Sequence, residues 1–471
     1  MKNVVNIKKE KIDSKEKLQE DIAKMNSFGE RTTGSKGHKN FVSWLENEIE
    51  WMGLIIHKKE YTFDRWQEKT ASLYSEEEKI ELASVYPYSG ETNKEGVTGE
   101  LTYVKKHNYK KAFGKIAVIE IDNAKSIPMP FIMNVVGAYP QDTKLTPSDG
   151  DLVISSTLWT PDLKKLKAAG IRAVIFVWKG VSKEKGKDQY LPFTSDYADI
   201  PAVWVDSIQG EKLIAAAKNK KKVSLILEAE KEKGASTESF YVEIEGKNPS
   251  EVILINSHTD GVNVVEENGA IAMLSMIRYL KEEKPEKTLI FAFVTGHFRL
   301  PVFKGTSQAT SRWLMDHKEL WDGKDGHKRA VAGLTVEHLG AMEWKDTKDG
   351  YQATGEIQSE YVYVNNTFMQ KVWMHAIEHR KINRTVFLKG HNKFQFGESQ
   401  PLFEEKIPVI GFIPMPDYLL TNSKTREIDK FNVDLMAEQL QSCLIALMLL
   451  DKSSSKEIGT GRNYTYFLGK N

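Results

Sequence analysis

The segment Val252-Ile-Leu-Ile-Asn-Ser-His258-Thr-Asp260-Gly261 joins an apolar run to a short polar turn. The run at residues 252–255 predicts a strand buried on both faces of a sheet. Ligands of open α/β sheets bind beyond the carboxyl ends of the strands, so His258 and Asp260 are candidate site residues. On extended backbone they point the same way, and a metal-binding histidine needs an acceptor at its other ring nitrogen. A His-Asp pair that only pins the loop is the alternative, and spacing leaves both open.

The chain around this segment alternates between strand and helix patterns. Residues 269–280 carry apolar side chains at helical spacing, and a second apolar run follows at 289–294. Further runs lie at 330–336 and 409–413, and the apolar positions from Met436 to Leu450 predict a long amphipathic helix. This order predicts the α/β class, with a mixed, mostly parallel sheet and helices on both faces.

Two more expected strand ends carry polar residues. His297-Phe298 follows the second apolar run, and Glu337-His338 follows the third. Adjacent residues on a strand face opposite sides, so only one of Glu337 and His338 is expected to enter a site. Glu266 and Glu267 precede the helix, where acids also act as simple partners of the helix dipole.

Composition excludes some classes of partner. The 471 residues include 66 basic and 65 acidic side chains, a net charge of +1, which argues against nucleic acid and membrane surfaces. Cys443 is the single cysteine, so an intrachain disulfide is impossible. The first twenty residues lack an apolar segment, and we expect no run of the ~18 apolar residues that a membrane span needs. A cytoplasmic protein, with a homodimer as an open option, is the expectation.

The chain is expected to contain more than one domain. Residues 75–232 carry short β-type runs, and the charged segment 230–237 predicts a linker. The expected division is 1–74 and 233–455 for the two parts of the α/β domain, 75–232 for an insertion and 456–471 for a tail. A dinucleotide site is set aside because no Gly-x-Gly-x-x-Gly follows a strand.

The sequence resembles the co-catalytic zinc aminopeptidase family, which includes glutamate carboxypeptidases and glutaminyl cyclases. The resemblance rests on Phe-Gly-Glu-Arg-Thr-Thr-Gly-Ser at 28–35, His-Thr-Asp at 258–260 and Glu-Asn-Gly-Ala at 267–270. The runs at 114–119, 163–171 and 200–205 resemble a β-rich protease-associated domain inserted before the catalytic sheet. The resemblance implies that His258, Glu267 and Glu337 bind metal and that Asp260 orients His258.

The sequence also departs from the family pattern. The family has a Glu-Glu pair, general base and then metal ligand, where this chain has His297-Phe298. The last ligand, a histidine, would fall near Tyr418 or Leu419. Both ligands that belong only to the second metal are therefore missing.

One zinc ion, rather than two, is thus the expectation, with loss of the metal as the alternative. His258, Glu267 and Glu337 would bind it, Asp260 would support it, and His297 would act as the general base. His297 could instead only fill space, bonded to Glu398, and His297 or His338 could have become a ligand. Other candidate site residues are Glu266, His338, Glu398 and Tyr418. Two functions follow: a metal-dependent hydrolase acting on a peptide or small amide, or a binding protein that kept the fold and lost the chemistry.

Overall fold

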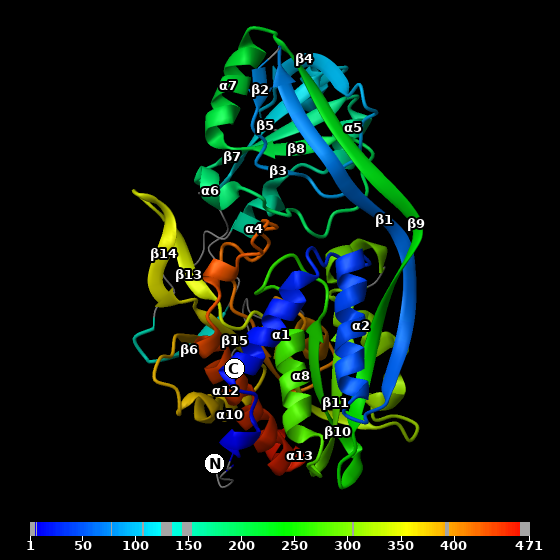
Figure 1. The fold of residues 1–471 in the computed structure, drawn as a ribbon, viewed down its shortest axis with the longest axis vertical. Coiled ribbons are helices and arrows are strands. Elements are labelled where there is room, and N and C mark those ends of the chain that lie inside the picture. The colour runs from blue at the N-terminus through cyan, green and yellow to red at the C-terminus, as the bar shows by residue number, and fades with distance from the viewer. Residues whose placement is uncertain are drawn as a thin grey trace, which may run out of the picture.

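The computed structural model describes residues 5, 7–76, 78–105, 108–123, 134–143, 153–303, 306–390 and 395–461. Two lobes are stacked along the long axis of the molecule (Figure 1). They are joined by β1 (Ile56–Ser75) and β9 (Lys222–Ile244), a long antiparallel pair that runs from one lobe into the other. The expected linker at 230–237 is therefore wrong: these residues pair with β1 inside β9, because a continuous ladder satisfies their backbone groups.

The larger lobe is built on a mixed sheet. Its order is β9-β11-β10-β12-β17-β15-β16-β6, and the contacts among β11, β10, β12 and β17 are parallel. These strands are β10 (Asn248–His258), β11 (Lys287–Val294), β12 (Arg329–Val336), β17 (Val409–Phe412), β15 (Glu360–Val364), β16 (Thr385–Leu388) and β6 (Val135–Tyr139). The edge strand β6 comes from the segment expected to be inserted, so the expected boundaries do not coincide with the two lobes.

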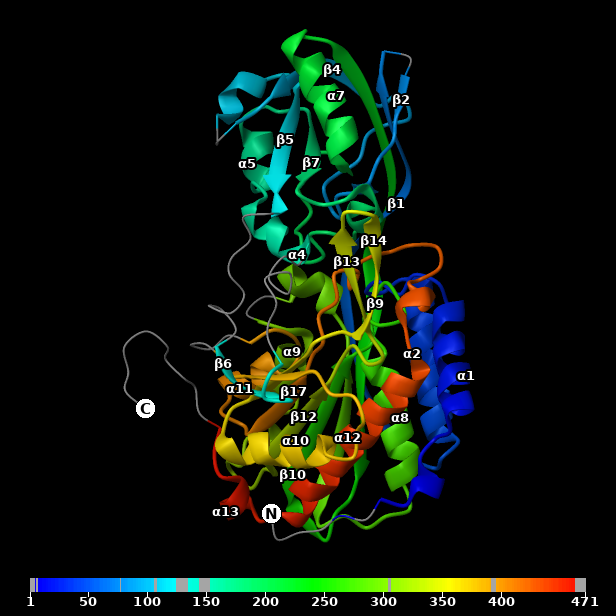
Figure 2. The same ribbon diagram turned by 90° about the vertical axis from the view of Figure 1, so that its left-hand side faces the viewer.

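Helices cover both faces of this sheet, which confirms the predicted fold class (Figure 2). Ile253 and Ile255 of β10 pack into the core on one face, and Val252 and Leu254 pack into the core on the other. On the first face lie α1 (Lys15–Ser27), α2 (Lys36–Glu50), α8 (Gly269–Leu280), α10 (Thr367–Ile377) and α12 (Val433–Lys452); on the second lie α9 (Ala309–Asp316) and α11 (Gln400–Glu404). Burial on both faces is the reason for the continuous apolar run in β10.

Helix α12 is long and apolar enough, by length and composition, to cross a membrane. This corrects the expectation that no segment of the chain reaches that size. In the structure, 61% of the most apolar 18-residue stretch of this helix is buried. Met436, Leu440 and Leu447 belong to the core of the larger lobe. Packing against the sheet therefore accounts for its composition.

The smaller lobe continues the same 15-stranded sheet beyond β9, in the order β9-β4-β5-β7-β8-β3, with β2 paired to β1. Its strands are β2 (Glu78–Ile80), β3 (Ser84–Val85), β4 (Val97–Tyr103), β5 (Ile116–Asp122), β7 (Ala173–Lys179) and β8 (Ala202–Val205). Its helices are α4 (Val153–Ser156), α5 (Leu163–Ala168), α6 (Lys183–Gly186) and α7 (Ser207–Lys218). Trp178 and Trp204 stack in its core with ring centroids 3.9 Å apart.

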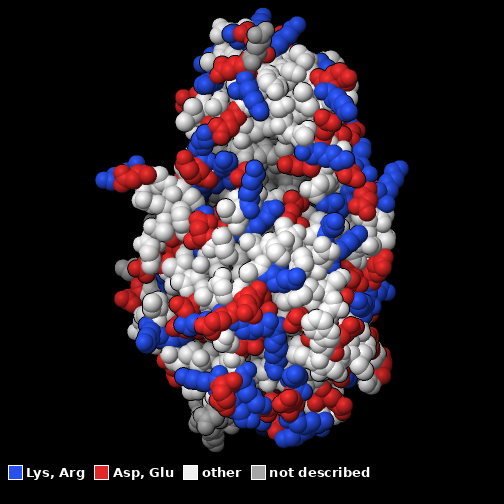
Figure 3. Space-filling model, in the orientation of Figure 1, with Lys and Arg blue, Asp and Glu red and all other residues white. Residues whose placement is uncertain are grey.

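The remaining elements are peripheral. The hairpin of β13 (Met342–Thr347) and β14 (Gly350–Ile357) projects beside the junction of the lobes (Figure 1), and α13 (Ser455–Ile458) follows α12. Short 3-10 helices are η1 (Lys9–Lys11), η2 (Tyr109–Ala112), η5 (Thr157–Trp159), η6 (His297–Val302), η7 (Lys318–Leu320) and η8 (Ile428–Lys430). The expected tail reaches into residues 462–471, which lie outside the described residues. Acidic and basic side chains are interspersed on the face in Figure 3.

Candidate metal centre

The carboxyl ends of three adjacent strands bring the predicted histidines together. His258 is the last residue of β10, His297 begins η6 just after β11, and Glu337 follows β12. Because β10 lies between β11 and β12 and runs parallel to both, these three ends meet at one edge of the sheet. The rings of His258 and His297 stack with centroids 4.1 Å apart.

His258, Glu266 and His338 form a compact group of possible metal ligands. One donor atom from each lies within 4.8 Å of the other two, and all three side chains are buried. His258 Nε2 lies 3.9 Å from Glu266 Oε1, and His338 Nε2 lies 4.0 Å from Glu266 Oε2. Neither Nε2 atom, nor Glu266 Oε2, has a hydrogen-bond partner. Buried polar atoms are nearly always paired, so this group points to a ligand.

The outer nitrogens of both histidines are held by backbone carbonyl oxygens. His258 Nδ1 lies 2.8 Å from the carbonyl oxygen of Asp260, and His338 Nδ1 lies 2.6 Å from that of Pro414. A carbonyl only accepts, so each Nδ1 carries the proton and each Nε2 keeps its lone pair for the site. Burial lowers the pKa of His258 to about 4 and the pKa of His338 well below its usual value, which favours the neutral, metal-binding form. Two imidazole nitrogens and one carboxylate are a zinc-type donor set, and the residues fit such an ion.

Glu267, predicted as a ligand, is engaged differently. It forms an ion pair with the guanidinium of Arg31, and both side chains are 0% exposed. Arg31 also donates to the carbonyl oxygens of Met25, Gly29 and Asn263. Burial raises the pKa of Glu267 to about 7, although Arg31 opposes the shift. Oε1 of Glu267 thus faces the Arg31 guanidinium, and Oε2 of Glu267 has no hydrogen-bond partner.

Glu337, the other predicted carboxylate ligand, supports the neighbouring loop. Its Oε1 accepts a 2.7 Å hydrogen bond from the backbone N–H of Glu398, and its Oε2 is unpaired. Burial, followed by the nearby Glu398, raises the pKa of Glu337 to about 8. Gly397, at φ +76°, makes this approach possible, because a Cβ there would lie 2.6 Å from Glu337 Oε1. Of the pair 337–338, His338 is the one that joins the three-donor group.

His297 is oriented toward this group by Glu398. Its Nδ1 lies 2.7 Å from Glu398 Oε1, and its Nε2 lies 3.9 Å from Glu266 Oε1. Glu398 also accepts from the backbone N–H groups of Ala309 and Thr310 at the start of α9. Burial lowers the pKa of His297, but the hydrogen bond and charge of Glu398 outweigh it and raise the pKa to about 9.

Asp260 holds the chain on both sides of His297 instead of contacting the His258 ring through its carboxylate. Its Oδ2 accepts from the N–H groups of Gly296 at 3.2 Å and Phe298 at 3.1 Å, and from the hydroxyl of Thr33. These donors turn the carboxylate toward the end of β11. The acceptor for His258 is therefore the carbonyl group of Asp260.

Two positions of the family pattern carry no donor toward the group. Phe298 packs against Tyr190 and Phe193 of the smaller lobe, with ring centroids 5.6 and 5.3 Å apart. The hydroxyl of Tyr418 lies 2.8 Å from the carbonyl oxygen of Met342 and 3.0 Å from that of Lys430, so its proton is used in the core.

Arg31 is a site residue that the sequence did not predict, although it lies inside the 28–35 segment. The available signal was that Arg31 is the only basic residue of this short segment. Its partner Glu267 lies 236 positions away, a distance that no local pattern spans.

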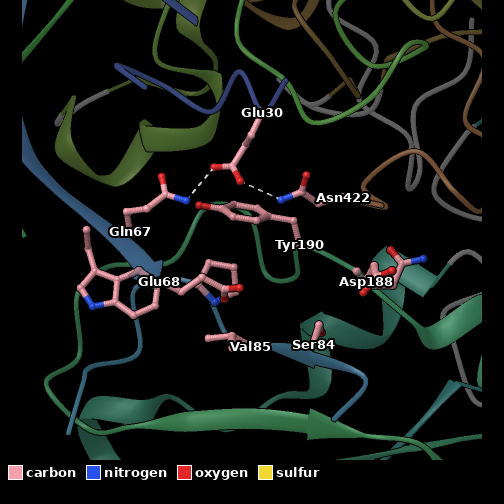
Figure 4. Close-up of a pocket in the computed structure, with 11 residues that line it drawn as sticks. Glu30, Gln67, Glu68, Ser84, Val85, Asp188, Tyr190 and Asn422 are labelled. Carbon is pink, nitrogen blue, oxygen red and sulfur yellow. Dashed lines mark hydrogen bonds between the residues drawn. The ribbon is translucent and has the colours of Figure 1, made fainter. Parts of the chain in front are cut away.

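A separate cavity of about 90 Å³ lies at the junction of the lobes (Figure 4). Glu30 accepts there from Gln67 Nε2 at 3.1 Å and from Asn422 Nδ2 at 3.0 Å. The cavity is lined by residues of β1, of the 188–190 segment and of the loop after β17, but by none of the predicted site residues.

The fold and the three-donor group define a class: an α/β protein with a buried metal-type centre at the carboxyl edge of its sheet. Residues 240–297, which hold β10, the turn and His297, match the model of peptidase family M28. The structure is similar to BSAP, a zinc aminopeptidase from Bacillus subtilis, with a TM-score of 0.62 and 17% identity over 94% of this chain and 97% of that one.

Two further solved structures are similar over nearly their whole length. The aminopeptidase from Aneurinibacillus sp. strain AM-1 gives a TM-score of 0.61 and 16% identity over 97% of this chain and 96% of that one. A peptidase M28 precursor from Shewanella amazonensis SB2B gives 0.57 and 14%, over 93% and 97%. A comparison with curated protein sequences finds no significant match. The predicted resemblance to zinc aminopeptidases is confirmed, and at these identities it establishes the fold.

Proposed function

We propose that this protein is a metal-dependent hydrolase that acts on a peptide or small amide through one ion, held by His258, Glu266 and His338. The observation that carries the proposal is the unpaired, buried state of both Nε2 atoms and of Glu266 Oε2. Similarity in fold to zinc aminopeptidases supports the choice of reaction class. This ligand set differs from the predicted one in using Glu266 and His338 where Glu267 and Glu337 were expected.

The side chains around the group support a single ion. Arg31 already supplies a fixed positive charge to Glu267. Phe298 has no donor atom, and the hydroxyl of Tyr418 is bonded to backbone carbonyls elsewhere. A second ion would therefore lack a ligand at both positions where the family pattern places its own.

The chain's own residues would handle orientation and proton transfer. A divalent metal bound there would polarise a carbonyl oxygen and make a bound water more acidic. His297 is assigned to proton transfer at Nε2, because Glu398 holds its Nδ1 and the ring lies against His258. Asp260 keeps His297 in place through the N–H groups of Gly296 and Phe298. Phe193 stacks on His297 at 5.3 Å and would limit water on that side.

A binding protein without turnover is the second candidate. It is favoured by Phe298, an apolar side chain beside the proposed proton-transfer group, and by the tight enclosure of His297, which is 7% exposed. Such a protein would bind metal but cleave nothing.

Adjacent glutamates offer a matched test of the ligand set. Glu266→Gln should abolish stoichiometric zinc in protein grown with zinc, whereas Glu267→Gln should keep it, because Glu267 is paired with Arg31. Zinc content is measured by elemental analysis on folded protein. Loss of zinc only in Glu267→Gln would refute the proposed ligand set.

Turnover is tested on a panel of aminoacyl and peptide substrates. His297→Phe should abolish cleavage and leave the zinc content largely unchanged. Zinc-loaded wild type that cleaves nothing in the panel would favour the binding protein.

A further inference from the structure

Asn263 is a buried residue whose side chain forms hydrogen bonds both to the loop that carries Glu266 and to the chain after β17. Its side chain is 0% exposed, and its Oδ1 accepts from the backbone N–H groups of Val265 at 3.0 Å and Glu266 at 3.2 Å. Its Nδ2 lies 3.1, 2.8 and 3.1 Å from the carbonyl oxygens of Tyr418, Leu419 and Thr421. One amide group thus ties the turn that ends at Glu266 to the segment 418–421.

The same segment is where the smaller lobe docks. Its backbone bonds to residues 188–190: Tyr190 N donates to Leu420 O at 2.8 Å, and Asn422 N donates to Asp188 O at 2.7 Å. Gln189 Nε2 also lies 3.1 Å from the hydroxyl of Thr421. The segment is therefore held on one edge by the smaller lobe and on the other by Asn263.

We propose that Asn263 is a positioning residue for Glu266, which fixes this ligand by clamping its turn to the docked segment 418–421. The inference rests on the proposed metal centre. The side chain of Glu266 has no hydrogen bond of its own at Oε2, so its place relative to His258 and His338 depends on its backbone. Without Asn263, the backbone N–H groups of Val265 and Glu266 lose their acceptor. The Glu266 carboxylate would then be held less firmly in the position where it binds the metal. Supporting residues of this kind typically change metal affinity by about 10- to 100-fold.

Asn365 provides a matched control. It is also 0% exposed, and it also bridges two parts of the chain, with Nδ2 to Ile407 O at 2.7 Å and Oδ1 from Val409 N at 2.8 Å. It lies at the amino end of β17, the opposite end of that strand from Pro414 and the metal centre. Asn365→Ala removes a comparable buried amide without touching the Glu266 turn.

The experiment measures cobalt(II) affinity by competition with a chelator, together with the visible absorption spectrum of the bound cobalt. Asn263→Ala should bind cobalt about 10- to 100-fold more weakly than wild type and with a changed spectrum, whereas Asn365→Ala should match wild type in both. Glu266→Gln should itself bind cobalt much more weakly, so its affinity is measured by direct titration. In that background, Asn263→Ala should change the remaining affinity by less than about threefold, because the two residues act as one unit.

Several outcomes would overturn the inference. Equal weakening in Asn263→Ala and Asn365→Ala would show a general effect of lost stability. Additive effects in the double variant would show that Asn263 does not act through Glu266. If Asn263→Ala does not fold, Asn263→Ser keeps an acceptor for the turn but cannot span to the three carbonyls; unchanged cobalt affinity and spectrum in that variant would contradict the clamp. Absence of cobalt binding in wild type would overturn the proposed function, and the inference with it.

Discussion

The buried pair of Arg31 and Glu267 should make a large and separable contribution to stability. Both side chains are 0% exposed, so Arg31→Met would leave the Glu267 carboxylate buried without a cation. Breaking such a pair from one side costs about 3–5 kcal/mol, a large share of the ~5–15 kcal/mol that folded proteins possess. Arg31→Met also removes the donors for three carbonyl oxygens.

The double variant Arg31→Met/Glu267→Leu separates these effects. The three carbonyls lose their donors in both variants, so their contribution cancels when the two are compared. What remains is the cost of keeping the Glu267 carboxyl group buried, either charged or with the proton that its raised pKa favours, and the double variant should be more stable than Arg31→Met by roughly 3 kcal/mol. Equilibrium unfolding in urea measures the difference in free energy of unfolding. The buried pair of Arg380 and Glu360 serves as a comparison: Glu360 also accepts from Thr385 and Gln439, so Arg380→Met should lower the free energy of unfolding less than Arg31→Met does. A double variant no more stable than Arg31→Met would refute the reasoning.

Two further predictions concern close packing and pH. Gly261→Ala should lower the free energy of unfolding by about 1–3 kcal/mol, because the new Cβ would lie 2.0 Å from Glu267 Oε2. Gly99→Ala, whose Cβ would be no closer than 3.3 Å to its neighbours, should have little effect in the same urea titration, and equal losses would contradict this view. Burial raises the pKa of Asp417 from 3.8 to about 6 in spite of its 2.8 Å ion pair with Lys185. The folded state therefore holds this proton more tightly than the unfolded chain, so wild type should gain roughly 2 kcal/mol relative to Asp417→Asn as the pH falls from 7 to 4. Unfolding at several pH values checks this, and a difference that is constant or of opposite sign would be inconsistent with it.

Much of the fold could be predicted because its signals are local. The apolar run of β10 and the apolar residues at helical spacing in α8 both reflect burial inside the larger lobe, and both elements occur where expected. The long ladder of β1 and β9 was not predictable in this way. The charged residues of β9 at 230–237 have the composition of a linker, and only their pairing with β1 makes them a strand.

In the candidate site, local sequence patterns predicted which segments meet, but they did not predict which residue of each adjacent pair faces the site. The order of strands and the rule for parallel sheets were enough to bring His258, His297 and the 337–338 pair to one edge. Whether Glu266 or Glu267 faces the histidines depends on Arg31, which contacts Glu267 from far along the chain. Whether Glu337 or His338 enters depends on Pro414, whose carbonyl oxygen holds the His338 ring, and on the left-handed backbone of His338 at φ +60°.

The sequence by itself therefore determined the class of fold and the edge of the sheet where chemistry would lie, because hydrophobic periodicity and strand direction are properties of short segments. Only the tertiary structure decided which donor atoms meet. That choice depends on hydrogen bonds and ion pairs between segments that are distant in sequence, such as those of Asn263 with the chain after β17. Neighbouring residues of the same chemical type look alike in a sequence, and they differ only in the partners that the fold provides.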